Sequence, residues 1–157
     1  MERNEHARAS RWDELATDWC PVARALSVIG DRWTILIVRD CFLGKSRFDE
    51  FQKSLGVTRH VLAARLKQLV EDGVLERNAY SQKPLRYAYS LTDKGRDLFP
   101  IVVALLQWGD RHAPSPDGPP VQLVDRENGQ PIAPLLVRSD DGRVLQARDV
   151  RAKPTAT

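Results

Sequence analysis

The turn at Gly56-Val57 constrains the fold of this chain more than any other feature, because it joins two helical patterns with very few residues between them. The first pattern starts near Ser46, a residue type that caps helix N-termini, and Asp49 follows three residues later. The second starts at Thr58, another capping type, and runs to about Asp72. Apolar residues recur at helical spacing in both patterns, at Phe48, Phe51 and Leu55 and then at Leu62, Leu66 and Leu69. We therefore expect two short helices joined by a tight turn.

The outer face of the second of these helices is small and basic over its first turns. It carries Arg59, His60, Ala63, Ala64 and Lys67, opposite the leucines. Two helices joined by a short glycine-containing turn, the second with such a face, are typical of a helix-turn-helix.

Two strand patterns follow. Residues 74–77 and 86–91 are short, alternating and rich in β-branched or aromatic side chains, and residues 78–84 form a polar turn between them. This pattern predicts a β-hairpin, the wing of a winged helix. Residues 92–96 then lead into a last helix, whose apolar residues are Leu98, Ile101, Val102, Leu105, Leu106 and Trp108. That helix offers more apolar surface than a small domain needs to bury.

Two helices are expected upstream of the turn. Cys20-Pro21 opens the first, because proline at the first helical position gives up a hydrogen bond that would be unmade anyway, and Gly30 ends it. Asp31 can cap the second, residues 32–42, which is apolar on nearly all sides. Such a helix is buried on most faces, so we expect it at the centre of the core.

The charge of the chain is uneven. Its 157 residues carry a formal net charge of +3. Residues 21–113 hold fifteen basic and ten acidic side chains, whereas residues 1–20 are net acidic and residues 114–157 are neutral. A basic middle segment is compatible with a surface that binds a polyanion, and equally with an ordinary solvated surface.

Several functional classes are excluded by what the sequence lacks. It has no apolar run of the roughly 18 residues that a membrane-spanning helix needs, and its first fifteen residues do not form a secretory signal. Two cysteines cannot make a disulfide scaffold, so we expect a cytoplasmic protein without a membrane partner. The sequence contains no metalloprotease, phosphate-loop or nucleophile-elbow motif, so no enzymatic activity, cofactor or metal is expected.

Composition divides the chain into four parts. Residues 1–19 form a lead segment, expected to be a dimer arm, residues 20–113 the main domain, and residues 114–120 a proline-rich linker. Residues 121–157 contain a weak repeat, in which 123–132 aligns with 136–145 and each unit reads as strand, tight turn, strand. The expected fold is mainly α with a small β wing, a winged helix-turn-helix, plus a small β appendage at the C-terminus. A flexible tail is the alternative for the appendage.

Several spaced motifs between about residues 15 and 113 resemble one family. They are Cys20-Pro21-Val22, Gly30-Asp31-Arg32-Trp33, Arg47-Phe48, residues 62–69 with Glu71-Asp72-Gly73, residues 87–92, and Trp108-Gly109. Their order and spacing resemble the HxlR-type transcriptional regulators of the MarR-like superfamily. The resemblance implies a dimeric bacterial winged helix-turn-helix that binds operator DNA, with the first and last helices of the domain at the dimer interface.

The appendage resembles a two-knuckle zinc ribbon that is appended to some HxlR-type regulators. The resemblance implies cysteine or histidine ligands near four positions, which here hold Asp125, Asn128, Arg138 and Asp141. Thiolate ligation is impossible with this set, and an arginine would face the metal. We expect a ribbon that has lost its zinc and packs against the main domain or the partner subunit.

A recognition helix reads DNA with the side chains at its N-terminus, because the major groove is about as wide as an α-helix. Arg59 is suited to a bidentate contact with guanine, and Ala63 and Ala64 permit close approach. Lys67 is a candidate phosphate contact; so is Arg65, which alternatively pairs with Asp72 or Glu71. The full set of expected DNA-binding residues is Lys45, Ser46 and Arg47 at the preceding helix start, Thr58, Arg59, His60, Ala63 and Lys67, and Lys83 and Arg86 on the wing.

The cysteines and tryptophans leave two kinds of regulation open. Cys20 precedes a helix N-terminus, where a thiolate is stabilised, although Asp18 opposes this. Cysteines at the matching position sense oxidants or electrophiles in several HxlR-type regulators; a purely structural Cys-Pro helix start is the alternative. Cys41 is expected to be an inert core residue. A small effector could bind near Trp12, Trp19, Trp33 and Trp108, unless these are ordinary core residues.

The residues and the resemblance together predict a sequence-specific DNA-binding transcriptional regulator. We expect a repressor that binds a palindromic operator as a homodimer, with activity modulated by oxidation of Cys20 or by a small effector. The alternative is a winged-helix module that contacts proteins and does not bind DNA.

Overall fold

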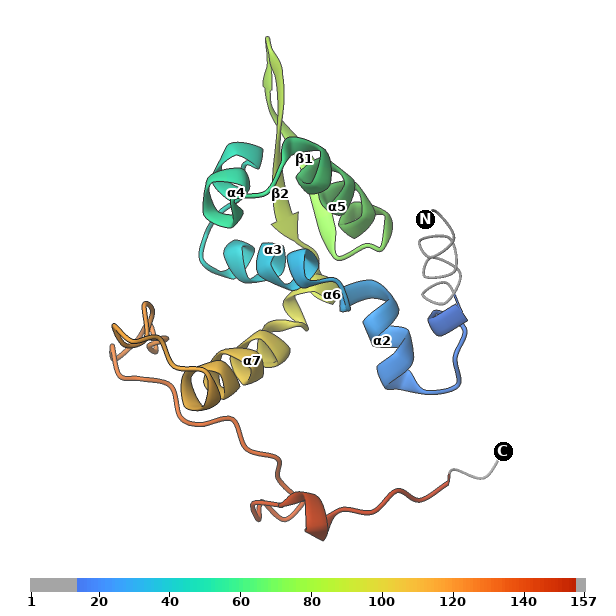
Figure 1. Cartoon of the computed structure of the whole chain (residues 1–157), viewed down its shortest axis with the longest axis vertical. Coiled ribbons are helices and arrows are strands. Elements are labelled where there is room, and N and C mark those ends of the chain that lie inside the picture. Colours follow the sequence, from blue (N-terminus) through green and yellow to red (C-terminus); the bar gives the residue numbers. More distant parts are fainter. Residues whose placement is uncertain (1–13, 155–157) are drawn as a thin grey trace. The chain divides into compact units, whose positions relative to one another are not determined.

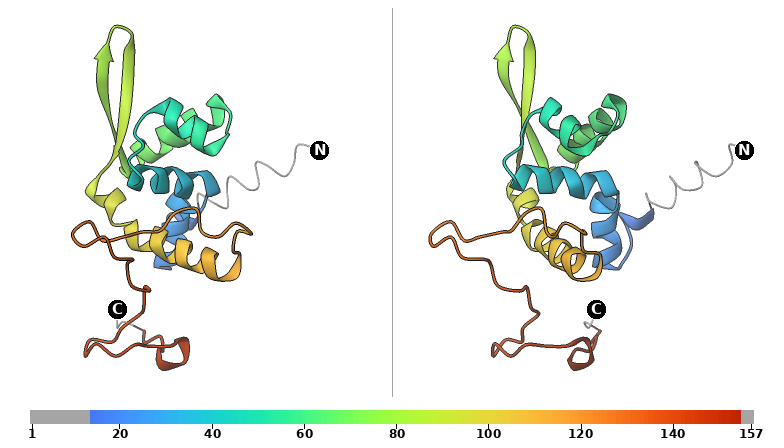
Figure 2. Two further views of the ribbon diagram at one scale, coloured as in Figure 1. Left: turned by 90° about the vertical axis from the view of Figure 1, so that its left-hand side faces the viewer. Right: turned by 60° about the vertical axis from the view of Figure 1, so that its left-hand side comes forward.

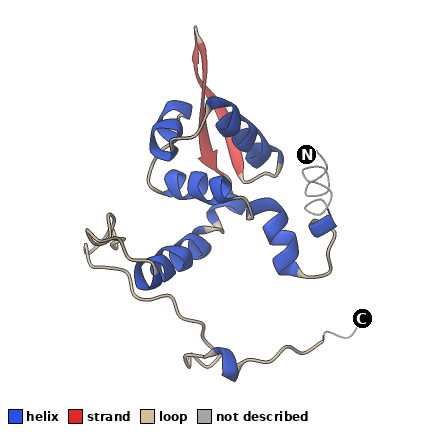
Figure 3. Ribbon diagram, viewed as in Figure 1, coloured by secondary structure: helices blue, strands red, loops and turns tan. Residues whose placement is uncertain are grey.

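The computed structural model describes residues 14–154, and its division into two units falls between Val102 and Val103. The first unit is a winged helix-turn-helix, which confirms the expected fold class (Figures 1 and 3). Its elements are α2 (Pro21–Ile29), α3 (Arg32–Phe42), α4 (Phe48–Leu55), α5 (Arg59–Glu71), β1 (Leu75–Gln82), β2 (Leu85–Leu91) and α6 (Asp93–Arg96). Helix α7 (Phe99–His112) spans the division. Most of the acidic lead segment lies outside the described residues.

Helix α3 forms the centre of the core, as its apolar sequence predicts. The Asp31 carboxylate caps it by accepting hydrogen bonds from the backbone N–H groups of Trp33 and Thr34, at 2.9 and 3.3 Å. Ile37 and Val38 are fully buried on this helix. The other buried apolar residues packed into the same cluster are Phe51, Val57, Leu62, Leu66, Leu69, Val74, Leu75, Leu91 and Val102.

The turn between α4 and α5 depends on Gly56. This residue ends α4 with φ +64°, in the left-handed region that glycine enters without steric cost. Thr58 then caps α5, because its hydroxyl accepts a hydrogen bond from the backbone N–H of Val61 at 3.4 Å. The tight turn and the capping threonine are both as predicted. Leu62, Leu66 and Leu69 turn inward, which leaves the opposite face of α5 exposed.

The wing is longer than the sequence pattern indicated. We expected strands at 74–77 and 86–91 with a seven-residue turn; instead β1 and β2 pair from Leu75–Leu91 to Gln82–Leu85, with an irregularity between Ala79 and Ser81. The ladder continues because a two-stranded hairpin in water can carry polar side chains on both faces. The hairpin extends past α4 and α5 (Figures 1 and 2).

The segment before α4 is attached to the base of the wing. The backbone N–H of Tyr89 donates to the Ser46 carbonyl at 2.7 Å, and Arg47 forms an antiparallel bridge with Ala88. The start of the helix-turn-helix and the wing are therefore joined by main-chain hydrogen bonds, which do not depend on side-chain identity.

A short helix, α6, lies between the wing and α7, where the sequence indicated a single lead-in. Thr92 caps it through a hydrogen bond from the Gly95 N–H at 3.1 Å. Gly95 is buried so tightly that a methyl group in place of its hydrogen would lie 2.2 Å from the Val74 carbonyl oxygen. Glycine is needed here for close approach rather than for an unusual backbone angle.

The second unit contains the end of α7 and the appendage. Each repeat is closed by a single bridge, Val124 with Pro131 and Arg138 with Val144, in place of the strands that we expected. Gly129 and Gly142 have φ of +69° and +86°, as the predicted tight turns require. In the first repeat the Asp125 N–H donates to the Gln130 carbonyl at 2.8 Å, and the Ile132 N–H donates to the Leu123 carbonyl at 3.1 Å. A 3-10 turn (Ala147–Asp149) follows the second repeat.

The four positions compared with zinc ligands are occupied by ordinary turn contacts. Asp125 accepts a hydrogen bond from the Glu127 N–H at 2.7 Å, and Asn128 accepts one from the Gln130 N–H at 2.9 Å. Arg138 donates to the Gly142 carbonyl at 2.8 Å, and Asp141 pairs with Arg143 at 2.8 Å. In each case the side chain makes its contact within its own turn. Within residues 14–154, no helix is long and apolar enough to cross a membrane.

Candidate nucleic-acid interface

The exposed side of α5 presents the residues that the sequence assigned to DNA. Thr58, Arg59, His60, Ala63 and Lys67 are all exposed, and the side chain of Lys67 contacts only Glu71 among the ion pairs of the described chain, at 3.7 Å. None of these side chains contributes to the apolar core. The helix thus displays two small residues flanked by cations, a surface that another rigid body can approach closely.

Arg59 is held by one face of α4. Its guanidinium donates to the Gln52 side-chain oxygen at 3.3 Å, lies 3.7 Å from the Asp49 carboxylate, and stacks over the Phe48 ring at 4.7 Å. Its side chain is nevertheless 71% exposed. The arginine is therefore oriented before any ligand arrives while its outer edge stays accessible, which reduces the conformational entropy lost on binding.

A groove of about 450 Å³ separates α4 and α5 from the wing. Three arginines line it, Arg47 from the α4 N-cap, Arg59 from α5 and Arg86 from β2. The guanidinium of Arg47 stacks on the wing residue Tyr80, 4.8 Å from the ring centroid. Three of the expected DNA-binding residues, far apart in sequence, are thus brought to one concave and basic surface.

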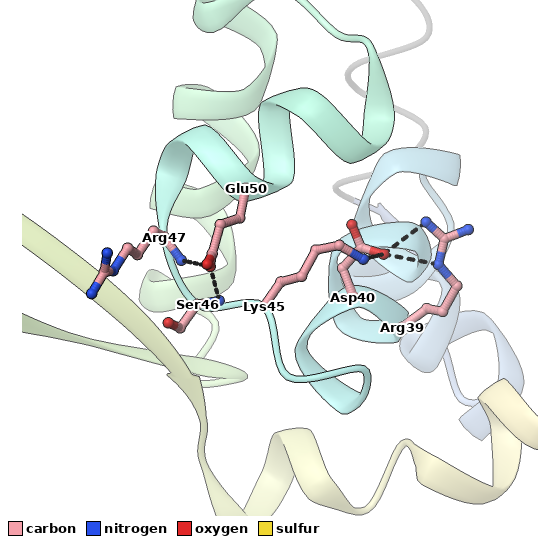
Figure 4. A network of polar contacts seen from close by, with 6 residues as sticks. All are labelled: Arg39, Asp40, Lys45, Ser46, Arg47 and Glu50. Carbon is pink, nitrogen blue, oxygen red and sulfur yellow. Dashed lines mark hydrogen bonds and ion pairs between the residues drawn. The ribbon is translucent and has the colours of Figure 1, made fainter. Parts of the chain in front are cut away.

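The N-terminus of α4 differs from the expected cap. We predicted Ser46 as the N-cap, with Asp49 three residues later. Instead Arg47 occupies the N-cap position, and Glu50 accepts hydrogen bonds from the backbone N–H groups of Ser46 and Arg47, both at 2.9 Å (Figure 4). Glu50 stands three residues into the helix, where a long acid can reach back to these amides. Their hydrogen bonds hold the pKa of Glu50 below its usual value.

Lys45 also has a partner within the chain. Its ammonium lies 3.1 Å from the Asp40 carboxylate, which is fully buried and paired with Arg39 at 2.8 Å (Figure 4). The Lys45 side chain is only 31% exposed. The backbone amides and the lysine at this helix start are thus already engaged within the chain, so Arg47 is the cation that remains exposed there.

Basic side chains continue along the wing. Lys83 lies exposed in the turn between the strands, and Arg86 follows on β2. Arg77, on β1, stacks on Tyr87 at 4.1 Å. The wing therefore offers cations both at its tip and along the groove.

Arg65, a candidate phosphate contact with Asp72 or Glu71 as alternative partners, pairs with a different carboxylate. Its guanidinium lies 3.3 Å from Asp31 on α3, rather than on Asp72 or Glu71 of its own helix region. Asp72 instead accepts from Gln68 at 3.2 Å. Glu71 and Asp72 stand six and seven residues further along the chain, nearly two helical turns away, whereas the packing of α5 against α3 brings Asp31 closer.

Sequence reasoning missed the residues that orient the arginines. Asp49 and Gln52 contact Arg59, and Tyr80 supports Arg47. Only the helical spacing of Phe48, Asp49 and Gln52, which places them on one face of α4, could have indicated the first pair. The Tyr80 contact joins the wing to the start of α4, so no local sequence pattern predicts it.

The two cysteines occupy different environments. Cys20 stands at the N-cap of α2, half-buried, and its backbone N–H donates to Asp18 at 2.8 Å. Burial, with a contribution from the Asp40 carboxylate, raises the pKa of the Cys41 thiol to about 12. Cys41 therefore stays protonated and unreactive at neutral pH, as expected for a core cysteine.

The tryptophans within residues 14–154 differ in exposure. Trp19 is 89% exposed and Trp108 is 62% exposed, while Trp33 is half-buried beside the guanidinium of Arg32. Trp12 lies outside the described residues.

The arrangement of α4, α5 and the wing has a counterpart among known families. The family model described as HxlR-like helix-turn-helix matches residues 28–117. The chain belongs to this HxlR-like family. It is a transcriptional regulator of the helix-turn-helix type, not an enzyme.

Similarity to relatives extends beyond the HxlR-like domain. The uncharacterized HTH-type transcriptional regulator Rv3095 of Mycobacterium tuberculosis is 44% identical over 133 residues, which cover 85% of this chain and 84% of that protein. The crystal structure of PA1607 is 49% identical, covers 90% of this chain and 99% of that chain, and has a TM-score of 0.84. These spans exceed residues 28–117, so both relatives share part of the chain outside the HxlR-like match.

A third similar protein matches a smaller share of this chain. The redox regulator HypR in its oxidized form is 37% identical, covers 61% of this chain and 100% of that chain, and has a TM-score of 0.57.

Proposed function

We propose that this protein binds operator DNA in a sequence-dependent manner and represses transcription. The observation that carries the proposal is the exposed N-terminal turn of α5, where Arg59 lines a groove together with Arg47 and Arg86. Membership of a family of helix-turn-helix transcriptional regulators supports it. Repression rather than activation is the mode that the resemblance to HxlR-type regulators favours.

In this proposal α5 enters the major groove with its N-terminus leading. Arg59 contacts guanine, Thr58 and His60 lie beside it, and Ala63 lets the helix approach the bases. Lys67 and Arg47 contact phosphates, while Lys83 and Arg86 reach the neighbouring minor groove or backbone from the wing. Ser46 and Lys45 act through the geometry of the helix start, because their amide and ammonium groups already have partners.

A homodimer is the proposed binding unit. Apolar side chains are exposed on the first helix of the domain, at Val22 and Leu26, and on the last, at Leu105 and Trp108. Exposed apolar side chains of this size favour association, because burying them removes apolar surface from water. A two-fold dimer would read a palindromic operator with half-sites about 34 Å apart, one helical turn of DNA.

Regulation by oxidation of Cys20 is part of the proposal. The similar protein HypR is a redox regulator, and Cys20 is a half-buried free cysteine at the N-cap of α2. A Cys20→Ser protein should keep its DNA when diamide or a quinone is added, whereas the natural protein should release it. Release by both proteins would exclude Cys20 as the sensor, and release by a small aromatic effector would favour the second kind of regulation.

The direct test is fluorescence anisotropy with duplex fragments of the upstream region of the protein's own gene, in excess competitor DNA. We expect salt-dependent binding that resists competition, and a loss of about 1–3 kcal/mol with Arg59→Ala. Arg126→Ala, which removes an equal charge from the appendage, is the matched control and should bind normally. Binding that competitor abolishes would instead favour a winged-helix module that contacts proteins.

A further inference from the structure

The exposed carboxylate of Asp49 faces the arginine that is expected to read the DNA. Its Oδ1 lies 3.7 Å from the Arg59 guanidinium, and the two side chains are 88% and 71% exposed. Gln52, one turn further along α4, accepts a hydrogen bond from the same guanidinium at 3.3 Å. Arg59 therefore has a neutral partner and a charged one, side by side on α4.

We propose that Asp49 is a specificity-determining residue, which lowers the affinity for DNA that offers Arg59 no guanine. This inference rests on the proposed function. The Asp49 carboxylate is not needed to hold Arg59 in place, because Gln52 and the Phe48 ring also orient the arginine side chain. An exposed ion pair also adds little to folding. The negative charge of Asp49 therefore affects the free energy of DNA binding rather than that of folding.

The carboxylate opposes binding wherever phosphates approach α4. A duplex carries a dense row of negative charges, and a fixed negative charge beside it is repelled. On non-specific DNA, Arg59 turns toward phosphate and leaves Asp49 unpaired in that field. The repulsion is then not offset by any new contact.

Guanine changes this balance because of the shape of the guanidinium. Arginine has five N–H donors in a planar fork, so it can donate two hydrogen bonds to guanine and keep another edge on a carboxylate. Asp49 then remains paired while Arg59 reads the base. The cost of the carboxylate is therefore smaller on the operator than on other sequences, and specificity rises at the expense of overall affinity.

An acid in the first turn of α4 also has a purely structural explanation, since it lies near the positive end of the helix dipole. The two roles differ in what they change. A structural role would alter stability and would affect binding to all DNA alike, whereas a role in specificity changes the ratio of two affinities.

The experiment compares the full-length protein with Asp49→Asn and with Asp97→Asn, which removes the same charge from the exposed end of α6. Anisotropy titrations use the duplex selected from random fragments and a scrambled duplex of equal length, at several salt concentrations. Asp49→Asn should bind the scrambled duplex more tightly and lower the specificity ratio by roughly threefold to tenfold. Asp97→Asn should leave that ratio unchanged.

An unchanged ratio in Asp49→Asn, or equal weakening on both duplexes, would overturn the role of Asp49. Thermal melting of the same samples separates a folding defect from an effect on binding. If the natural protein selects no sequence at all, the proposed function fails first. That result is distinct from an Asp49→Asn variant that discriminates between the two duplexes as well as the natural protein does.

Discussion

The guanidinium of Arg65 on α5 lies 3.3 Å from the carboxylate of Asp31, the residue that caps α3. The Asp31 side chain therefore caps the central core helix α3 and also pairs with α5, the helix expected to enter DNA. Both contacts are made by partly exposed groups, 40% and 33% for the two side chains. The cap and the ion pair can be separated by substitution.

Asp31→Ala should lower the free energy of unfolding by about 1–2 kcal/mol, because the backbone N–H groups of Trp33 and Thr34 lose their acceptor. Asp31→Asn keeps a capping oxygen and loses only the charge, so it should cost no more than about 1 kcal/mol. Urea denaturation of both variants measures the difference. Equal losses would mean that the ion pair, rather than the cap, stabilises this junction.

Gly95→Ala should be severely destabilising. A Cβ at this position would lie 2.2 Å from the Val74 carbonyl oxygen and 2.9 Å from a methyl carbon of Leu91. The first contact is with main chain at the base of the wing, which cannot move away as a flexible side chain could. We expect a loss of about 1–3 kcal/mol or more, from overpacking, in thermal or urea unfolding. A variant as stable as the natural protein would show that α6 can shift freely against β1.

Glu50→Gln should remove a pH-dependent part of the stability. Hydrogen bonds from the Ser46 and Arg47 amides hold the pKa of Glu50 below its ordinary value of 4.5. Because the folded-state pKa is depressed, the stabilisation is fully present above that ordinary value and is lost as the pH falls through the folded-state pKa. The difference between the two proteins, measured by urea unfolding from pH 7 to pH 3, should therefore shrink toward the acid end. A constant difference would contradict this cap.

Lys83→Ala should weaken binding to all DNA similarly. Its ammonium lies in the exposed turn of the wing, and a phosphate contact carries no sequence information. The slope of log affinity against log salt should fall in magnitude by about 1. Arg59→Ala is the comparison, since it should also relax the choice of sequence. A change of sequence preference in Lys83→Ala would mean that the wing reads bases.

The two cysteines should differ in reactivity. Burial raises the pKa of Cys41 to about 12, so its thiolate is scarce at pH 8. Cys20 is half-buried at a helix N-terminus and should react with iodoacetamide first. Mass spectrometry of the peptides after a short exposure measures the order. Faster labelling of Cys41 would mean that the core around α3 opens readily.

Local sequence was enough to predict the helices around the turn. Gly56 and Thr58 act through their own backbone and hydroxyl groups, and the inward leucines of α5 follow helical periodicity. The central position of α3 followed from its apolar composition in the same way. The strand ends were wrong, because polar residues permit a longer exposed hairpin without requiring one.

The exposed basic face of α5 was also evident from the sequence, since periodicity assigns a face to each side chain. Which groups each cation meets was decided only by the tertiary structure. Lys45 pairs with the buried Asp40, Arg65 pairs with Asp31, and Arg47 stacks on Tyr80 across from the wing. The reason is physical: spacing along a helix fixes direction, whereas a salt bridge or a stack depends on which other element packs within a few ångströms.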